Sequence, residues 1–281
     1  MINDSRLISF MSTDECYAVH LLEGQNLIKD LALIHDLKGK GFLFYRDCVL
    51  SSLTLISLLK HGETLGFYID SPAPYFAFKV EMSEHGDLRT LMLPADFSDF
   101  PEEIDGTARV TKLINGKSPY NSIIKLVKSN PEMACNQMIK ESYQMQGEII
   151  LSADSDQSLL IMKLPRKSWD KDEILPEGKP FAEFRDNIFK NMDTIFNKGA
   201  NDEQAIIKKM ESLDFYHLKS KDVNFKCSCS RERMVMGVSS LLAAHTLDEI
   251  FEGKEDIETK CDYCNTFYQI LRTDVENSIK H

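Results

Sequence analysis

The chain has 281 residues, with 33 basic and 44 acidic side chains, a formal net charge of -11 and a sequence pI near 5.2. An acidic chain of this kind lacks the broad basic surface with which proteins hold nucleic acid or anionic membranes. Its 43% hydrophobic content supports a proper core, in one large domain or two to three smaller ones. No stretch approaches 18 uninterrupted apolar residues and the N-terminus has no continuous apolar region, so we expect a cytoplasmic protein.

Residues 1–165 are predicted to form a mixed α/β domain with strands arranged as hairpins. Phe76, Phe78, Val80 and Met82 alternate with more polar neighbours, the period-two pattern of a strand with one buried face. Turn residues separate the candidate strands, which indicates an antiparallel sheet, and helical periodicity predicts helices on one of its faces. The further predicted strands are 88–93, 107–114, 120–126, 148–151 and 159–164. The predicted helices are about 42–60 and 132–146.

The composition changes after Pro165. In residues 166–226, 12 basic and 12 acidic side chains make 24 of 61 residues charged, against 27% for the whole chain, so this segment is expected to bury little. The helical spacing of apolar residues from Phe181 to Ile195, followed by Gly199, predicts one helix. Asn201 with Gln204 resembles a capping box and predicts a second. Short helices of this kind depend on packing against neighbouring domains, so we expect a charged helical linker here.

The most informative feature is a set of four cysteines near the C-terminus. Cys227 and Cys229 form a CxC pair, and Cys261 and Cys264 form a CxxC pair. If the intervening chain folds back, the four thiolates can supply the ligands of a tetrahedral zinc site. Each pair can also close into a short disulfide, although a reducing cytosol favours metal binding or redox sensing over permanent bridges. Oxidation of such a site would expel the metal.

The interval between the two pairs contains signals for a compact module. Thr246 and Glu249 form a capping-box pattern, and Gly253 follows the short helix that they would begin. The expected order is a CxC turn, one or two helices, and a CxxC turn that leads into a strand over 266–271. The chain is thus predicted to be α+β, with an N-terminal antiparallel sheet covered by helices (1–165), a charged helical linker (166–226) and a small C-terminal zinc-binding domain (227–281).

The remaining cysteines and two histidines are interpreted as structural. Cys16, Cys48 and Cys135 lie far apart in partly apolar contexts, which is typical of buried thiols. His217 and His245 are possible metal ligands in principle. With four cysteines already completing a site, each is expected to be an ordinary surface or packing residue.

Three classes of function remain open from the spacing alone. A structural zinc knot in an interaction protein and a zinc-dependent switch fit the spacing equally well. A thiol-disulfide oxidoreductase would use the CxxC motif at a helix N-terminus, whereas a strand is expected to follow it here. Nucleic-acid binding is disfavoured, because residues 221–281 carry 8 basic against 11 acidic side chains. Arg231 and Arg233 are accordingly expected to form ion pairs or to neutralise thiolate charge.

The runs VNFKCSCSRER and CDYCNTFY resemble the zinc-switch domain of the 33-kilodalton heat-shock protein family, the redox-regulated holdase chaperones of bacteria. The similarity extends upstream through ANDEQAIIKKMESLDFYHLKSKDVNFKC and TARVTKLINGKSPYNSIIKL, so it covers nearly the full chain. Family members usually show a YQG motif, a SEQ-type motif and a paired glycine in the first domain. This chain has Tyr120-Asn121-Ser122, Ser142-Tyr143-Gln144 and Gln157-Ser158 instead.

The resemblance implies a function for the cysteine set. It implies an ATP-independent holdase, not an enzyme, that binds unfolded client proteins under oxidative stress and forms a homodimer, if at all, when oxidised. One zinc ion in the reduced form would be bound by Cys227, Cys229, Cys261 and Cys264. Oxidation would release the zinc, form the disulfides Cys227–Cys229 and Cys261–Cys264 and unfold the linker. No nucleic-acid or membrane partner is implied.

Overall fold

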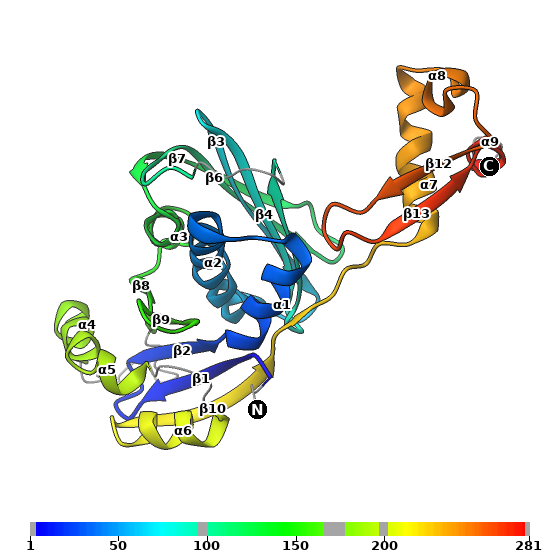
Figure 1. Cartoon of the computed structure of the whole chain (residues 1–281). Helices are drawn as coiled ribbons and strands as arrows, with labels where there is room; N and C mark the ends of the chain where they lie inside the picture. Colours follow the sequence, from blue (N-terminus) through cyan, green and yellow to red (C-terminus); the bar gives the residue numbers. More distant parts are fainter. Residues whose placement is uncertain (1–3, 95–99, 166–177, 197–201, 279–281) are drawn as a thin grey trace. The chain divides into compact units, whose positions relative to one another are not determined.

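The computed structural model describes residues 4–94, 100–165, 178–196 and 202–278 (Figure 1). It divides into two compact units, with the division in the sequence between Phe225 and Lys226. Among the described residues, the first unit is built on a six-stranded and a five-stranded sheet, and the second unit on a two-stranded hairpin. The predicted α+β class is confirmed.

The six-stranded sheet has the order β11-β5-β4-β3-β6-β7 and is antiparallel except for the short parallel pair β11–β5. The alternation from Phe76 to Met82 predicted one strand correctly, since all four of its apolar side chains are buried in β4. Positions 107–114 and 120–126 are also strands, as predicted. The strands of this sheet are β3 (Glu63–Pro72), β4 (Tyr75–Ser83), β5 (Asp87–Leu93), β6 (Ile104–Ile114), β7 (Tyr120–Ser129) and β11 (Asn224–Phe225).

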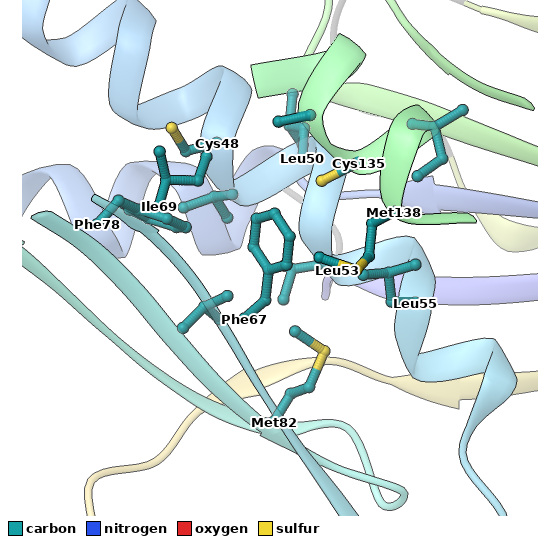
Figure 2. Close-up of a cluster of buried hydrophobic side chains, with 14 of the residues drawn as sticks. Cys48, Leu50, Leu53, Leu55, Phe67, Ile69, Phe78, Met82, Cys135 and Met138 are labelled. Carbon is teal, nitrogen blue, oxygen red and sulfur yellow. The ribbon is translucent and has the colours of Figure 1, made fainter. Parts of the chain in front are cut away.

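Three helices lie between the two sheets (Figure 1). Figure 2 shows Phe67 of the six-stranded sheet among Leu53, Cys135 and Met138, all of them fully buried. The prediction of a helix over about 42–60 is confirmed, whereas the predicted helix 132–146 ends earlier, because Gln144 adopts a left-handed backbone conformation. The helices are α1 (Gln25–His35), α2 (Gly39–Leu53), which continues as the 3-10 turn η1 (Thr54–Leu58), and α3 (Pro131–Glu141).

One helical stretch within the described residues, Gly39–Leu58, is long and apolar enough to cross a membrane by length and composition. Of its most apolar window, 67% is buried inside the protein, as in the core helix of a soluble domain. It is therefore weak evidence for a membrane span.

The five-stranded sheet is covered on both faces. Along β2, Ala18 and Leu22 join the core that contains α1 to α3, whereas Tyr17, Val19 and Leu21 join a second core on the opposite face. The antiparallel order is β10-β1-β2-β9-β8. Its strands are β1 (Arg6–Ser12), β2 (Tyr17–Glu23), β8 (Gly147–Leu151), β9 (Gln157–Lys163) and β10 (Phe215–Asp222).

Elements of the charged linker complete the second core. The single helix predicted from Phe181 to Ile195 is divided at Asn191 into two helices. They are α4 (Phe181–Lys190) and α5 (Met192–Ile195). A second helix is present, α6 (Glu203–Glu211), but the prediction that Asn201 caps it was wrong. Its N-cap is Asp202, whose side chain accepts a hydrogen bond from the Ala205 amide at 2.7 Å. Gly199 and Asn201 lie outside the described residues.

The expectation that the linker buries little is also wrong. Its apolar residues are few, but they are concentrated on the faces turned toward the five-stranded sheet. Strand β10, which the periodicity did not predict, pairs with β1 along its length and joins the linker to that sheet. Among the described linker residues, the buried ones are Phe184, Ile188, Ile195, Phe196, Ile206, Ile207, Met210, Phe215 and Val223.

The C-terminal unit contains the predicted helices, the CxxC turn and the strand after it in the expected order, together with a strand before that turn and a last helix that were not predicted. The capping box of Thr246 and Glu249 is present, with both reciprocal hydrogen bonds formed. Among its described residues, the hydrophobic core contains five buried side chains, Val235, Val238, Phe251, Ile270 and Val275, and six partly buried hydrophobic residues pack against them. The elements are α7 (Arg231–Ser240), a 3-10 turn η2 (Leu241–Ala243), α8 (Leu247–Phe251), β12 (Asp256–Lys260), β13 (Phe267–Leu271) and α9 (Arg272–Ser278).

Candidate metal centre

Two turns bring the four cysteines together. Cys227 and Cys229 lie in the loop before α7, which Ser230 caps, and Cys261 and Cys264 lie in the turn between β12 and β13. One ligand atom from each cysteine lies within 4.8 Å of the other three. Among the described residues this is the one group of histidine, cysteine or acidic side chains with the geometry to hold a metal ion.

The sulfur positions fit a tetrahedral site. Sulfurs bound at about 2.3 Å to a tetrahedral zinc lie about 3.8 Å apart. Cys227 Sγ lies 3.7 Å from Cys261 Sγ, and Cys229 Sγ lies 3.3 Å from Cys264 Sγ. Four thiolates are also the soft ligands that zinc accepts in closed structural sites. The donor set and its spacing are therefore suitable for one zinc ion.

Backbone hydrogen bonds fix the CxxC turn. The Cys261 amide donates to the Thr266 carbonyl at 2.9 Å, and the Asn265 amide donates to the Cys261 carbonyl at 2.8 Å. Asn265 has a φ of 59°, a left-handed conformation that asparagine tolerates better than most residues. The chain therefore reverses between the two thiols and places both on one side of the turn.

Arginines hold the CxC loop. Arg233 Nη1 donates to the Ser228 carbonyl at 2.8 Å and to Ser228 Oγ at 2.6 Å. Arg231 forms an ion pair with Asp274, as predicted, and donates to the Gln269 carbonyl at 3.2 Å. Arg233 thus fastens the CxC loop to α7, and Arg231 fastens the start of α7 to β13 and to Asp274.

The local environment shifts the pKa values of the thiols in different directions. Burial raises the pKa of Cys227 to about 12, and burial also raises the pKa of Cys261. Burial acts on Cys264 in the same direction, but hydrogen bonds, first from the Thr266 hydroxyl and amide, lower its pKa to about 7. Metal binding must therefore displace protons from Cys227 and Cys261 at neutral pH, and its affinity should rise with pH.

Two contacts at the site were not predicted from the sequence. Thr266 Oγ1 lies 3.2 Å from Cys264 Sγ, and Tyr268 Oη lies 3.0 Å from Cys229 Sγ. Both residues follow the CxxC motif at alternate positions of the last hairpin. The alternate positions of Thr266 and Tyr268 in the run NTFY place both side chains on one face of the chain, which was the available signal in the sequence. Only the pairing of β12 with β13 determines that this face is turned toward the sulfurs.

The other candidate residues lie elsewhere. His217 belongs to β10 and its Nε2 lies 3.0 Å from Ser220 Oγ, and neither it nor His245 is part of the metal-binding group. Cys16, Cys48 and Cys135 are buried free thiols in the first unit. Burial raises the pKa of Cys48 and of Cys135, as the structural interpretation of these thiols predicts.

The chain thus belongs to the class of proteins that combine an α+β unit with a small module in which four cysteine thiols can bind a metal ion. The profile of the Hsp33 protein family matches residues 5–271, so the chain belongs to this family. Its function is accordingly that of a chaperone, and the family name does not indicate an enzyme.

Individual relatives agree with the family assignment. The chain is 21% identical to a 33 kDa chaperonin of Aquifex aeolicus, over 92% of this chain and 84% of the relative. It is 32% identical to one from Ruminiclostridium cellulolyticum, over 33% of this chain and 31% of the relative. The crystal structure of the 33 kDa chaperonin from Thermotoga maritima superimposes with a TM-score of 0.73 at 13% identity, covering 99% of this chain and 98% of that chain, which shows a shared fold.

The positions at which the chain departs from the family motifs have structural contacts. Ser122 Oγ lies 2.6 Å from Ser142 Oγ, which joins β7 to the end of α3. Tyr120 donates to the Ser142 carbonyl at 3.3 Å. Ser158 donates to the Leu50 carbonyl at 2.8 Å in the core. These residues connect elements of the first unit, and none belongs to the thiol cluster.

Proposed function

We propose that the chain is a redox-regulated, ATP-independent holdase that the loss of one zinc ion activates. In the reduced form Cys227, Cys229, Cys261 and Cys264 would bind the zinc. The observation that carries the proposal is the four-sulfur cluster in a unit whose described residues form one small hydrophobic core. Such a cluster can make the fold of the unit depend on the redox state of its thiols.

The size of the C-terminal core supports this dependence. A hydrophobic core with five buried residues and six partly buried ones packed against them is smaller than an independent domain of this length needs without metal or disulfides. A structural zinc site contributes an apparent free energy of about 10 to 16 kcal/mol to folding. Loss of the ion should therefore unfold residues 226–278.

The proposed oxidant is a peroxide. One hydrogen peroxide molecule takes two electrons from a pair of thiolates, which form one S–S bond, and with two protons it is reduced to two water molecules. Oxidation of the thiolates would remove the ligands of the zinc, and the unit would unfold. In the unfolded unit neighbours in sequence stay close while distant pairs separate, so the two bridges, which consume two peroxide molecules, would be Cys227–Cys229 and Cys261–Cys264. The bridge of the CxC pair is strained and hence readily reduced.

The linker offers a path from metal loss to client binding. Helices α4 and α6 cover an apolar face of the five-stranded sheet that includes Phe10, Tyr17 and Val19. Strand β11 ends at Phe225, two residues before Cys227, so unfolding of the metal-binding unit removes an ordered neighbour in sequence. If the linker then unfolds, its apolar residues and the sheet face become available to unfolding proteins.

The proposed partners are unfolded client proteins in the cytoplasm. The net charge of -11 and the acidic balance of residues 221–281 argue against nucleic-acid or anionic-membrane partners. A homodimer of the oxidised form is part of the proposal, because exposed apolar surface promotes self-association.

The rival oxidoreductase function is less well supported. Its CxxC motif would need a helix N-terminus to stabilise the attacking thiolate. Here the motif leads into strand β13. Reduction of insulin by the zinc-free protein at a catalytic rate would favour this rival.

Peroxide treatment of the reduced, zinc-loaded protein tests the proposal. We expect stoichiometric zinc release, measured with a chromogenic chelator, together with suppression of the aggregation of a chemically unfolded client, measured by light scattering. A reductant should reverse the disulfides. Zinc release without any change in client aggregation would instead support a purely structural zinc site.

A further inference from the structure

Two side-chain hydroxyls lie against the sulfurs of the thiol cluster, one at each cysteine motif. Tyr268 Oη lies 3.0 Å from Cys229 Sγ, the second thiol of the CxC pair. Thr266 Oγ1 lies 3.2 Å from Cys264 Sγ, the second thiol of the CxxC pair. The sulfurs of these two cysteines are in turn only 3.3 Å apart. Both hydroxyls therefore act on one pair of neighbouring sulfurs, which joins the two motifs.

The last hairpin holds both hydroxyls in place. Phe267, between them in sequence, is 59% exposed and points to the opposite face, since alternate side chains of a strand do so. The ring of Tyr268 packs against the hydrophobic core of the C-terminal unit. On the neighbouring strand β12, Thr259 donates to the Tyr268 carbonyl at 3.4 Å. The core and the hairpin thus fix the ring, and the ring places its hydroxyl on Cys229.

With zinc bound, the two hydroxyls must be the donors. A thiolate that coordinates zinc carries no proton, whereas tyrosine and threonine hydroxyls keep theirs at neutral pH. Each contact is then a charge-assisted hydrogen bond from a hydroxyl to a thiolate. Such outer-shell donors orient the ligands of a metal and withdraw electron density from them.

Oxidation begins with the sulfur electrons that these hydrogen bonds engage. A thiolate attacks one oxygen of hydrogen peroxide and the O–O bond breaks. The sulfur becomes a sulfenic acid, and the other oxygen leaves as hydroxide, which takes a proton to form water. The thiolate of a second cysteine then displaces hydroxide from the sulfenic acid and forms the S–S bond. Negative charge leaves the sulfur in the first step, so a hydrogen bond that stabilises the thiolate weakens there and raises the barrier.

We propose that the hydroxyls of Tyr268 and Thr266 shield the thiolates of Cys229 and Cys264 from oxidation and thereby set the peroxide concentration at which zinc is released. The proposal rests on the redox-regulated function and adds the residues that determine its sensitivity. A stronger or a second donor on a sulfur would make the switch respond later, and a missing donor would make it respond earlier.

Zinc release from the full-length, reduced, zinc-loaded protein over a series of peroxide concentrations tests the proposal. The slope of the release rate against peroxide concentration measures attack on sulfur, whereas the intercept measures spontaneous dissociation. Tyr268→Phe keeps the ring and Thr266→Val keeps the shape of the side chain, so each removes only a hydroxyl. Each should raise the slope by about threefold. Thr266→Ser, which retains a hydroxyl, should keep the wild-type slope.

The matched control is Thr259→Val. It removes a hydroxyl of the same hairpin that donates to a backbone carbonyl, and it should leave the slope unchanged. Trapping of sulfenic acids with dimedone, followed by mass spectrometry, identifies the sulfur that is attacked. The trapped fraction on Cys229 should rise in Tyr268→Phe, and the fraction on Cys264 should rise in Thr266→Val. Looser packing alone would raise the intercept and would not favour one sulfur.

Wild-type slopes in both hydroxyl variants, or a rise in trapping that the four thiols share evenly, would overturn the proposal. Light scattering with an unfolded client separates this failure from that of the proposed function. If peroxide still releases zinc and activates the wild-type protein, the redox-regulated function stands and only its control by these hydroxyls fails. Zinc release that does not depend on peroxide in the wild-type protein would overturn both.

Discussion

Cys261 is the most deeply buried of the four candidate metal ligands. It is the one cysteine of the four in the buried class, whereas the other three are partly exposed. Burial raises the pKa of its thiol, although the amides of Cys264 and Tyr263 act in the opposite direction. A hydroxyl at this position would keep the volume of the side chain but would not provide the soft anionic ligand that zinc requires.

The variant Cys261→Ser should therefore lose tight zinc binding. Zinc content after gel filtration should fall from one ion per chain to a substoichiometric amount. The circular dichroism signal of the full chain should also diminish, because residues 226–278 are expected to unfold. The matched control is Asp262→Ser, which changes an exposed side chain in the same turn and keeps all four thiols. A fully metallated Cys261→Ser protein would show that the ligand assignment is wrong.

Spacing alone identified the thiols that the structure brings together, because CxC and CxxC pairs are held close by their own short loops. The same spacing could not identify Thr266 or Tyr268 as neighbours of the sulfurs. Their contacts depend on the register of β12 with β13, which sequence alone does not reveal. The spacing of the cysteines therefore predicted which thiols come together, but not which other side chains contact their sulfurs.

At the scale of elements, the linker helices act as a cover for one face of the five-stranded sheet. The ring of Phe184 in α4 stacks on Tyr17 with centroids 3.8 Å apart and an interplanar angle of 5°. Tyr17 also donates to the Lys179 carbonyl, just before the helix. The cover is thus held by a small number of apolar contacts within a strongly charged segment.

Replacing Phe184 with alanine should loosen this cover without touching the thiols. Phe184 is 7% exposed, and truncation of a buried phenylalanine typically costs about 3 to 5 kcal/mol. We expect faster hydrogen exchange in α4 and α6, and partial suppression of client aggregation by the reduced, zinc-bound protein. Phe189→Ala is the matched control in the same helix, because Phe189 is 45% exposed. Equal behaviour of the two variants would contradict a role for this cover in holding the protein inactive.

Strand prediction was clearest where one face of a strand was buried. It missed the fully buried β2, although it found β9, which is buried along most of its length. In β4 the buried Phe76, Phe78 and Val80 alternate with residues of the outer sheet face, which gives the sequence a clear period of two. In β2 every residue is buried, because α1 to α3 and the linker cover opposite faces of the sheet. A strand covered on both sides has no polar face, so its sequence carries no alternation to detect.

At the scale of the whole molecule, the two units should differ in what stabilises them. The first unit has two hydrophobic cores and keeps its three free cysteines buried. The second has one small core and the thiol cluster. Removal of zinc should therefore act selectively, in contrast to heat or denaturant, which act on buried surface in both units.

Differential scanning calorimetry of the full chain with and without a strong zinc chelator tests this selectivity. The reduced, zinc-loaded protein should show a transition of the C-terminal unit that disappears on chelation, because its fold depends on the metal. The transition of the first unit should move by only a few degrees, since its cores contain no predicted ligand. The Cys261→Ser protein, already without zinc, should be insensitive to the chelator. If chelation leaves both transitions in place, the core of five residues suffices to fold the C-terminal unit, and zinc loss cannot be the event that opens it.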